Sequence, residues 1–163
     1  MRTTFTLSIL FLLLLTACSS KQKDLHPLTY HLHKKNFITQ ELLKNYKRWE
    51  GTPYCYGGED THGIDCSALV QTIYKEAFNI QLPRTTTLQM QMGKAVSKGA
   101  LQEGDLIFFQ TSFHSFHSAI YLEDGLFIHA SSKHGVTLSN INNPYWRAHY
   151  YQARRLLVHN NTL

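Results

Sequence analysis

One cysteine has the sequence neighbourhood that a thiol nucleophile requires. Cys66 follows Gly63-Ile64-Asp65, and the apolar residues after it recur with the spacing of one buried helical face: Leu69, Val70, Ile73 and Ala77. Cys66 is therefore predicted in the first turn of a helix, where unpaired backbone N–H groups and the helix dipole favour the thiolate that attacks a carbonyl carbon. The alternative for this residue is a small buried apolar side chain near a helix cap.

Two histidines on a predicted hairpin complete a possible catalytic group. With Glu123-Asp124-Gly125 as a three-residue loop and its glycine in the left-handed conformation, Leu122 pairs with Leu126. This register places His117 and His129 on the same face of the sheet as diagonal neighbours. A two-residue loop would place them on opposite faces.

The three side chains together indicate nucleophilic catalysis. We expect His117 to hold Cys66 as a thiolate and then to protonate the leaving amine. We expect His129 to hydrogen-bond the other ring nitrogen of His117 and fix its orientation. His117 could instead be an ordinary strand histidine, and His114 is a rival base in a predicted loop.

The reaction also needs hydrogen-bond donors for the carbonyl oxygen. The backbone N–H of Cys66 is one natural donor at a helix start. Tyr54 lies in a loop rich in Gly and Pro and could supply its hydroxyl as the second. Alternatively, its ring packs over the edge of the core.

The elements that must position these residues fall into two halves. Helical patterns over 39–50, 66–78 and 86–92 come first. Apolar runs typical of strands follow over 106–109, 117–122, 126–130, 136–138 and 150–158. Helices followed by antiparallel strands predict an α+β domain in which the nucleophile helix packs on the sheet.

The N-terminus resembles a bacterial lipoprotein signal. Arg2 precedes an apolar run that is too short to span a bilayer, and the run ends in Leu15-Thr16-Ala17-Cys18. We expect residues 1–17 to be removed, Cys18 to be lipidated, residues 18–36 to form a tether and residues 37–163 to form the domain. Ser19 favours the outer membrane, with the domain on the periplasmic side. An ordinary signal peptide cut nearby is the alternative.

Composition limits the other classes of function. The chain has 163 residues, room for one domain, and a net charge of +5. Its basic residues do not gather on one helix or alternate with aromatics, so we expect no nucleic acid partner. We expect a monomer without a cofactor. We also expect no metal ion, since His31 and His33 lack further ligands of suitable spacing. Cys55 and Cys66 could pair as a disulfide, which would abolish the nucleophile.

Six motifs, in this order and near this spacing, resemble the NlpC-type (NlpC and p-sixty) cell-wall cysteine peptidases: Pro53-Tyr54-x-Tyr56-Gly57-Gly58, Asp65-Cys66-Ser67, Leu82-Pro83-Arg84-Thr85, Gly104-Asp105-Leu106, His117-x-x-Ile120-Tyr121 and Phe127-Ile128-His129-Ala130. The tail from Pro144 to Arg155 resembles the short lipoprotein members related to NlpC. The resemblance implies a papain-like fold, with Cys66 as nucleophile, His117 as base and His129 as the orienting residue.

The same resemblance implies a substrate and further site residues. It implies hydrolysis of an amide bond in peptidoglycan stem peptides, either D-glutamyl-diaminopimelate or diaminopimelate-D-alanine across a cross-link. Tyr54 matches a tyrosine near the oxyanion, and Asp65 and Arg84 match positions near the substrate. Asp65 also fits a helix cap, and Arg84 fits a clamp between loops.

Three other functions stay open at this point. The domain could bind the cell wall without catalysis. Cys66, His117 and His129 could hold a metal ion that activates water. The thiol could also transfer the acyl group to an acceptor other than water.

Overall fold

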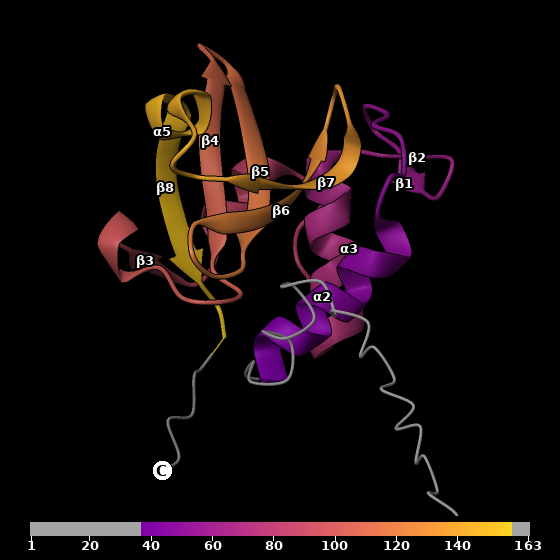
Figure 1. Ribbon diagram of the computed structural model, residues 1–163, viewed down its shortest axis with the longest axis horizontal. Helices are drawn as coiled ribbons and strands as arrows, with labels where there is room; N and C mark the ends of the chain where they lie inside the picture. The colour runs from indigo at the N-terminus through magenta and orange to yellow at the C-terminus, as the bar shows by residue number, and fades with distance from the viewer. Residues whose placement is uncertain (1–36, 158–163) are drawn as a thin grey trace, which may run out of the picture.

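A six-stranded antiparallel sheet lies beside two longer helices, α2 (Phe37–Trp49) and α3 (Cys66–Phe78) (Figure 1). The computed structural model describes residues 37–157. The strand order in the large sheet is β3-β8-β4-β5-β6-β7. Its strands are β3 (Lys94–Val96), β4 (Leu106–Ser112), β5 (Ser115–Tyr121), β6 (Leu126–Ser131), β7 (Gly135–Asn140) and β8 (Tyr150–Arg155). The predicted α+β class is confirmed.

The chain forms α3 where the sequence predicted it. Asp65 has an extended backbone and its Oδ1 accepts a hydrogen bond of 2.8 Å from the N–H of Ala68, which caps the helix start. The helix ends at Asn79, whose φ of 55° is left-handed. The first residue of α3 is therefore Cys66, and the side chain of the preceding residue holds that end of the helix in place.

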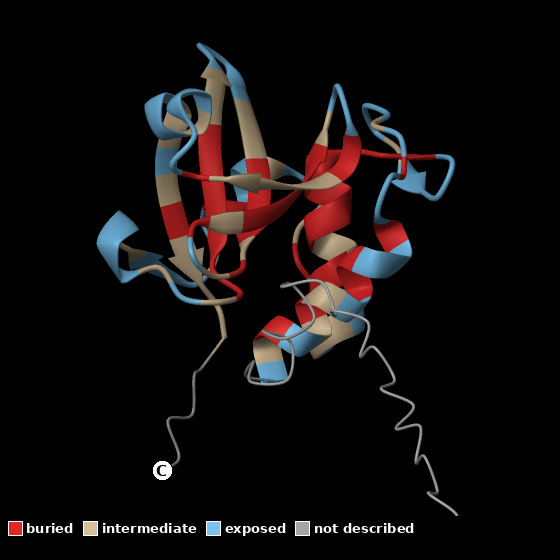
Figure 2. Ribbon diagram, viewed as in Figure 1, coloured by how far each residue is buried: buried red, intermediate tan, exposed pale blue. Residues whose placement is uncertain are grey.

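Strand β4 is buried on both faces and divides the core in two. Leu106 and Phe108 pack into the cluster that contains the buried faces of α2 and α3. Ile107 and Phe109 point to the opposite face. Figure 2 shows buried residues along α3 and through the central strands. Burial on both faces explains why this strand reads as a continuous apolar run.

The β5–β6 hairpin has the predicted register. Leu122 N–H donates to the Leu126 carbonyl at 2.8 Å, and Ile120 pairs with Ile128. Gly125 has a φ of 80°, as expected, and Asp124 also has a positive φ of 51°. Only Ile120 and Tyr121 of β5 pair with β6. Farther from the loop the two strands diverge, so the expected pair Ala119–His129 does not form.

Several short elements differ from the expectation. The structure adds β1 (Glu59–Asp60), β2 (Gly63–Ile64), β3, the turn η1 (Lys98–Ala100) and helix α5 (Pro144–His149). Helix α4 (Thr86–Gln89) ends earlier than predicted because the following residues form turns. These pieces are two to six residues long, too short for a periodic pattern to show.

The predicted signal peptide 1–17, Cys18 and the tether 18–36 lie outside the described residues, as does the end of the last predicted strand at residue 158. Within residues 37–157, none of the helices combines the length and the apolar character needed to cross a bilayer.

Candidate active site

The sulfur of Cys66 lies at the start of α3, where the side chain is 8% exposed. Burial alone raises the pKa of a thiol, because it disfavours the charged form. Here the hydrogen bond and charge of His117, the backbone N–H of Ser118 and the hydroxyl of Thr86 outweigh burial and lower the pKa of Cys66 to about 7. A substantial fraction of Cys66 is therefore thiolate at neutral pH.

The divergence of β5 from β6 makes this environment possible. Ser118 lies in the part of β5 beyond the β5–β6 ladder, so its N–H can face the sulfur instead of a neighbouring strand. Thr86, at the start of α4, places its Oγ1 at 3.8 Å from the Cys66 sulfur and at 3.3 Å from Ser118 Oγ. Residues from α3, α4 and β5 thus surround the thiol.

The two histidines are in direct contact. His117 Nε2 lies 2.9 Å from His129 Nδ1, and His129 Nε2 lies 2.9 Å from Ser139 Oγ on β7. His129 is 1% exposed, and burial, followed by the charges of His117 and His134, lowers its pKa to about 3. His129 is therefore neutral at physiological pH.

Transfer of a proton from Cys66 to His117 would set the direction of this hydrogen-bond chain. A protonated His117 donates from both ring nitrogens. Its Nε2–H must then donate to His129 Nδ1, and the proton on His129 Nε2 must donate to Ser139 Oγ. Ser139 was not predicted, although extending the expected strand 136–138 by one residue would have included it.

Trp146 of α5 packs on both imidazoles. Its ring is stacked on His117 with centroids 5.6 Å apart and meets His129 edge-on at 5.0 Å. The indole therefore packs against both rings and restricts their orientation. The sequence signal for Trp146 was only its place in the tail motif, which carried no role.

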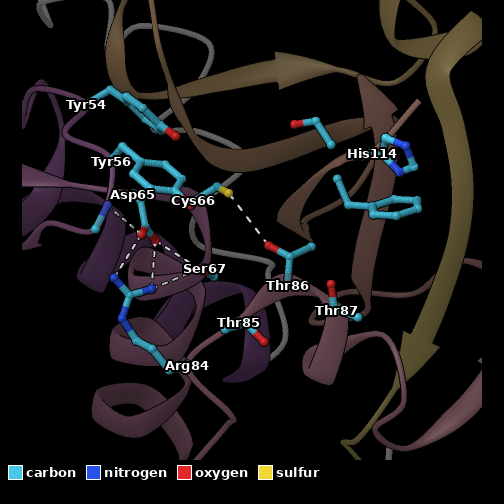
Figure 3. Close-up of a pocket in the computed structure, with 13 residues that line it drawn as sticks. Tyr54, Tyr56, Asp65, Cys66, Ser67, Arg84, Thr85, Thr86, Thr87 and His114 are labelled. Atoms are coloured by element: carbon cyan, nitrogen blue, oxygen red, sulfur yellow. Dashed lines mark hydrogen bonds and ion pairs between the residues drawn. The ribbon is translucent and has the colours of Figure 1, made fainter. Parts of the chain in front are cut away.

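Asp65 and Arg84 form an ion pair beside the thiol (Figure 3). Arg84 Nη2 lies 2.8 Å from Asp65 Oδ2, and Arg84 Nε lies 2.5 Å from Glu59 Oε1. Burial works against the charged carboxyl of Asp65, but Arg84, the N–H of Ala68 and the hydroxyl of Ser67 hold its pKa below the usual range. Both side chains thus have the cap and clamp contacts considered for them.

Tyr54 lines the same pocket, with its hydroxyl directed toward the region of Cys66 (Figure 3). Its backbone forms a parallel bridge with Ile64, which ties the loop to the residues just before α3. Burial, followed by the charge of Cys66, raises the pKa of Tyr54, so its hydroxyl stays protonated and can donate.

His114, the rival base considered from the sequence, lies in the exposed turn between β4 and β5.

Two clefts meet at Cys66, and both Cys66 and Tyr54 line each of them. The first cleft, of about 530 Å³, is bordered by Arg84 and the residues from Thr85 to Thr87 (Figure 3). The second cleft, of about 490 Å³, is bordered by both histidines, the β6–β7 turn, Tyr145 and Trp146. A substrate can therefore extend to both sides of the sulfur.

Cys55 and Cys66 are both free thiols, so the nucleophile is not tied up in a disulfide between them. Cys55 is exposed in the loop that carries Tyr54. Within residues 37–157, no group of three or more His, Cys, Asp or Glu side chains has an arrangement suited to a metal ion.

The chain is similar in sequence to known endopeptidases. The chain is 40% identical over 148 residues to a probable endopeptidase of Haemophilus influenzae, covering 88% of this chain and 92% of that protein. It is 36% identical over 163 residues to the murein DD-endopeptidase MepS/murein LD-carboxypeptidase of Escherichia coli K12, covering 88% and 87%.

Solved structures show the same fold. An NlpC/P60 family protein of Bacillus cereus superposes with a TM-score of 0.65 at 36% identity, over 72% of this chain and 39% of that one. A lipoprotein-like NLP/P60 protein of Staphylococcus aureus gives 0.68 at 34% identity, over 77% and 43%. The chain spans less than half of either solved chain. The superpositions confirm the papain-like fold. The NlpC/P60 family model matches residues 51–155, and this chain belongs to that family.

Proposed function

We propose that this protein is a peptidoglycan endopeptidase that uses Cys66 as a thiolate nucleophile. The observation that carries the proposal is the position of the Cys66 sulfur at the start of α3, with its pKa lowered to about 7 mainly by His117. His117 is in turn hydrogen-bonded to the buried, neutral His129. A nucleophile, a base and an orienting group are thus arranged in sequence.

In the first step the Cys66 thiolate attacks the carbonyl carbon of an amide bond. The resulting oxyanion accepts hydrogen bonds from the backbone N–H of Cys66 and the hydroxyl of Tyr54. Protonated His117 gives its proton to the amide nitrogen as the carbon–nitrogen bond breaks, which releases an amine and leaves a thioester on Cys66. His117 is then neutral and ready to act as a base.

In the second step neutral His117 takes a proton from water, and the resulting hydroxide attacks the thioester carbon. The carbon–sulfur bond breaks, the product acid leaves, and Cys66 returns as a thiolate beside a protonated His117. His129 accepts the hydrogen bond from His117 Nε2 in the charged state and keeps the ring oriented throughout.

The substrate assignment is supported by the names of the relatives. The Escherichia coli relative is named for murein cleavage as a DD-endopeptidase and LD-carboxypeptidase. We propose stem-peptide amide bonds as the target here, with D-glutamyl-diaminopimelate and diaminopimelate-D-alanine as the two candidates. We also propose that Cys18 is lipidated and anchors the domain at the outer membrane, on the periplasmic side.

Digestion of purified sacculi with mass analysis of the released muropeptides tests this function. Release of hydrolysed peptides that is stopped by a thiol alkylator and unaffected by a chelator supports the proposal. Loss of activity on chelation would indicate a metal enzyme, and products that carry a new acyl acceptor would indicate a transferase. Binding to sacculi without any release would indicate an inactive wall-binding protein.

A further inference from the structure

The position of His117 identifies the side of the site from which the leaving group departs. The residue that protonates the released amine must be within hydrogen-bond reach of it. His117 lines the second cleft and is not among the residues that line the first. The leaving group therefore occupies the second cleft, and the acyl part of the substrate occupies the first.

The two clefts differ in their charge. In the first cleft Arg84 is neutralised by Asp65, and it also contacts Glu59. The second cleft is lined by Lys133 and His134 from the β6–β7 turn, and its lining contains neither Asp nor Glu. Among residues 37–157, Lys133 has no carboxylate partner, so its positive charge is available to a substrate.

The backbone of the β6–β7 turn that carries these residues is braced by hydrogen bonds from a side chain. Ser131 Oγ accepts the backbone N–H groups of Lys133 and His134, each at 3.2 Å. His134 is close enough to His129 for its charge to lower the pKa of His129. The turn therefore places Lys133 in the lining of the cleft that also contains His117 and His129.

We propose that Lys133, assisted by His134, binds a free carboxylate next to the amine that is released. This inference rests on the proposed function and narrows its substrate. Where a cross-link is cut, the released diaminopimelate amine sits on a carbon that bears a free carboxylate, and a terminal D-alanine has the same feature. A diaminopimelate amine released from D-glutamate within a tetrapeptide has its neighbouring carboxyl in an amide bond. The second cleft thus favours an amide bond whose released amine lies next to a free carboxylate, as in a cross-link or at a terminal D-alanine.

A matched pair of substrates tests the proposal. Two cross-linked muropeptide dimers would differ only at the diaminopimelate whose amine is released, which carries a carboxylate in one and a carboxamide in the other. We expect wild-type kcat/KM to be about fivefold higher for the carboxylate, the size of an exposed ion pair. K133Q should bring this ratio to about one, K133R should retain it, and added salt should reduce it in the wild type.

The ratio is insensitive to partial misfolding, since both substrates report on the same enzyme sample. K94Q is the matched control, because it removes an equal charge from β3, at the opposite edge of the sheet from β7. Equal rates for both dimers in the wild type, or a preference that persists in K133Q, would overturn the inference and leave the proposed function intact. Cleavage of neither dimer by the wild type would overturn both.

Discussion

The Nε2 of His117 lies 2.9 Å from the Nδ1 of His129, so the hydrogen-bond partner of the proposed base is a neutral imidazole. A carboxylate in that place would stabilise a protonated partner by its charge. Neutral His129 gives only a hydrogen bond, so the charge on protonated His117 must be balanced chiefly by the Cys66 thiolate.

The thiol titration should show the effect of His117. In a Cys55→Ser background, alkylation of the peptide containing Cys66 should reach half its maximal rate near pH 7, which is the pKa of Cys66 in the folded protein. In His117→Ala only burial and the weaker donors remain, so the midpoint should move to about pH 8.5 or above. Mass spectrometry of the labelled peptide gives both curves. An unchanged midpoint in His117→Ala would contradict the assignment of His117 as the charge partner.

His129 should make stability depend on pH. Its pKa in the folded protein is about 3, below its value of about 6.5 in an unfolded chain, so the unfolded state binds the proton more tightly. Its stabilising contribution is therefore complete above pH 6.5 and is lost progressively toward pH 3. Relative to His129→Gln, the wild type should lose about 2 to 3 kcal/mol of unfolding free energy between pH 7 and 4.5. Urea unfolding at both pH values measures this, and parallel pH dependence in the two proteins would refute it.

Trp146 should act through the position of the imidazoles. Trp146→Ala removes the ring that packs on His117 and His129, and the freed rings should lower kcat by about tenfold. The Cys66 titration midpoint should rise as well, because His117, which lowers the pKa of Cys66, loses the ring that packs against it. Trp146→Phe, which keeps a ring, should restore most of both properties. If the alanine variant lost stability while its titration midpoint stayed in place, the role of Trp146 would be structural.

Asp65 should contribute mainly to stability. Asp65→Ala removes the cap of α3 and leaves Arg84 without its buried carboxylate partner, at a cost of about 2 kcal/mol. Since the pKa of Asp65 is lowered in the folded protein, the difference should shrink as pH falls through that pKa. Asp60→Ala is the control, because its side chain is 72% exposed. Equal unfolding midpoints for the two variants would show that the cap contributes little.

Short-range sequence patterns predicted the positions of Cys66 and the two histidines. The other contacts of the site depend on packing between elements distant in sequence. Cys66 at a helix start followed from Asp65 and the apolar spacing after it, and the shared face of the two histidines followed from Gly125 and the loop length. The divergence of β5 from β6, which frees the Ser118 N–H, depends on packing between elements distant in sequence. The contact of Trp146 with His117 has the same origin, so neither could be read from local pattern.

Digestion of sacculi by Cys66→Ala tests the central claim most directly. The substitution removes only the sulfur and leaves the cap at Asp65, so the variant should fold, as circular dichroism and binding to sacculi would verify. Cys55→Ala is the matched control and should retain activity, since the Cys55 thiol is exposed in a neighbouring loop. The account predicts that Cys66→Ala releases no muropeptide above background. Release at a rate near that of the wild type would contradict it.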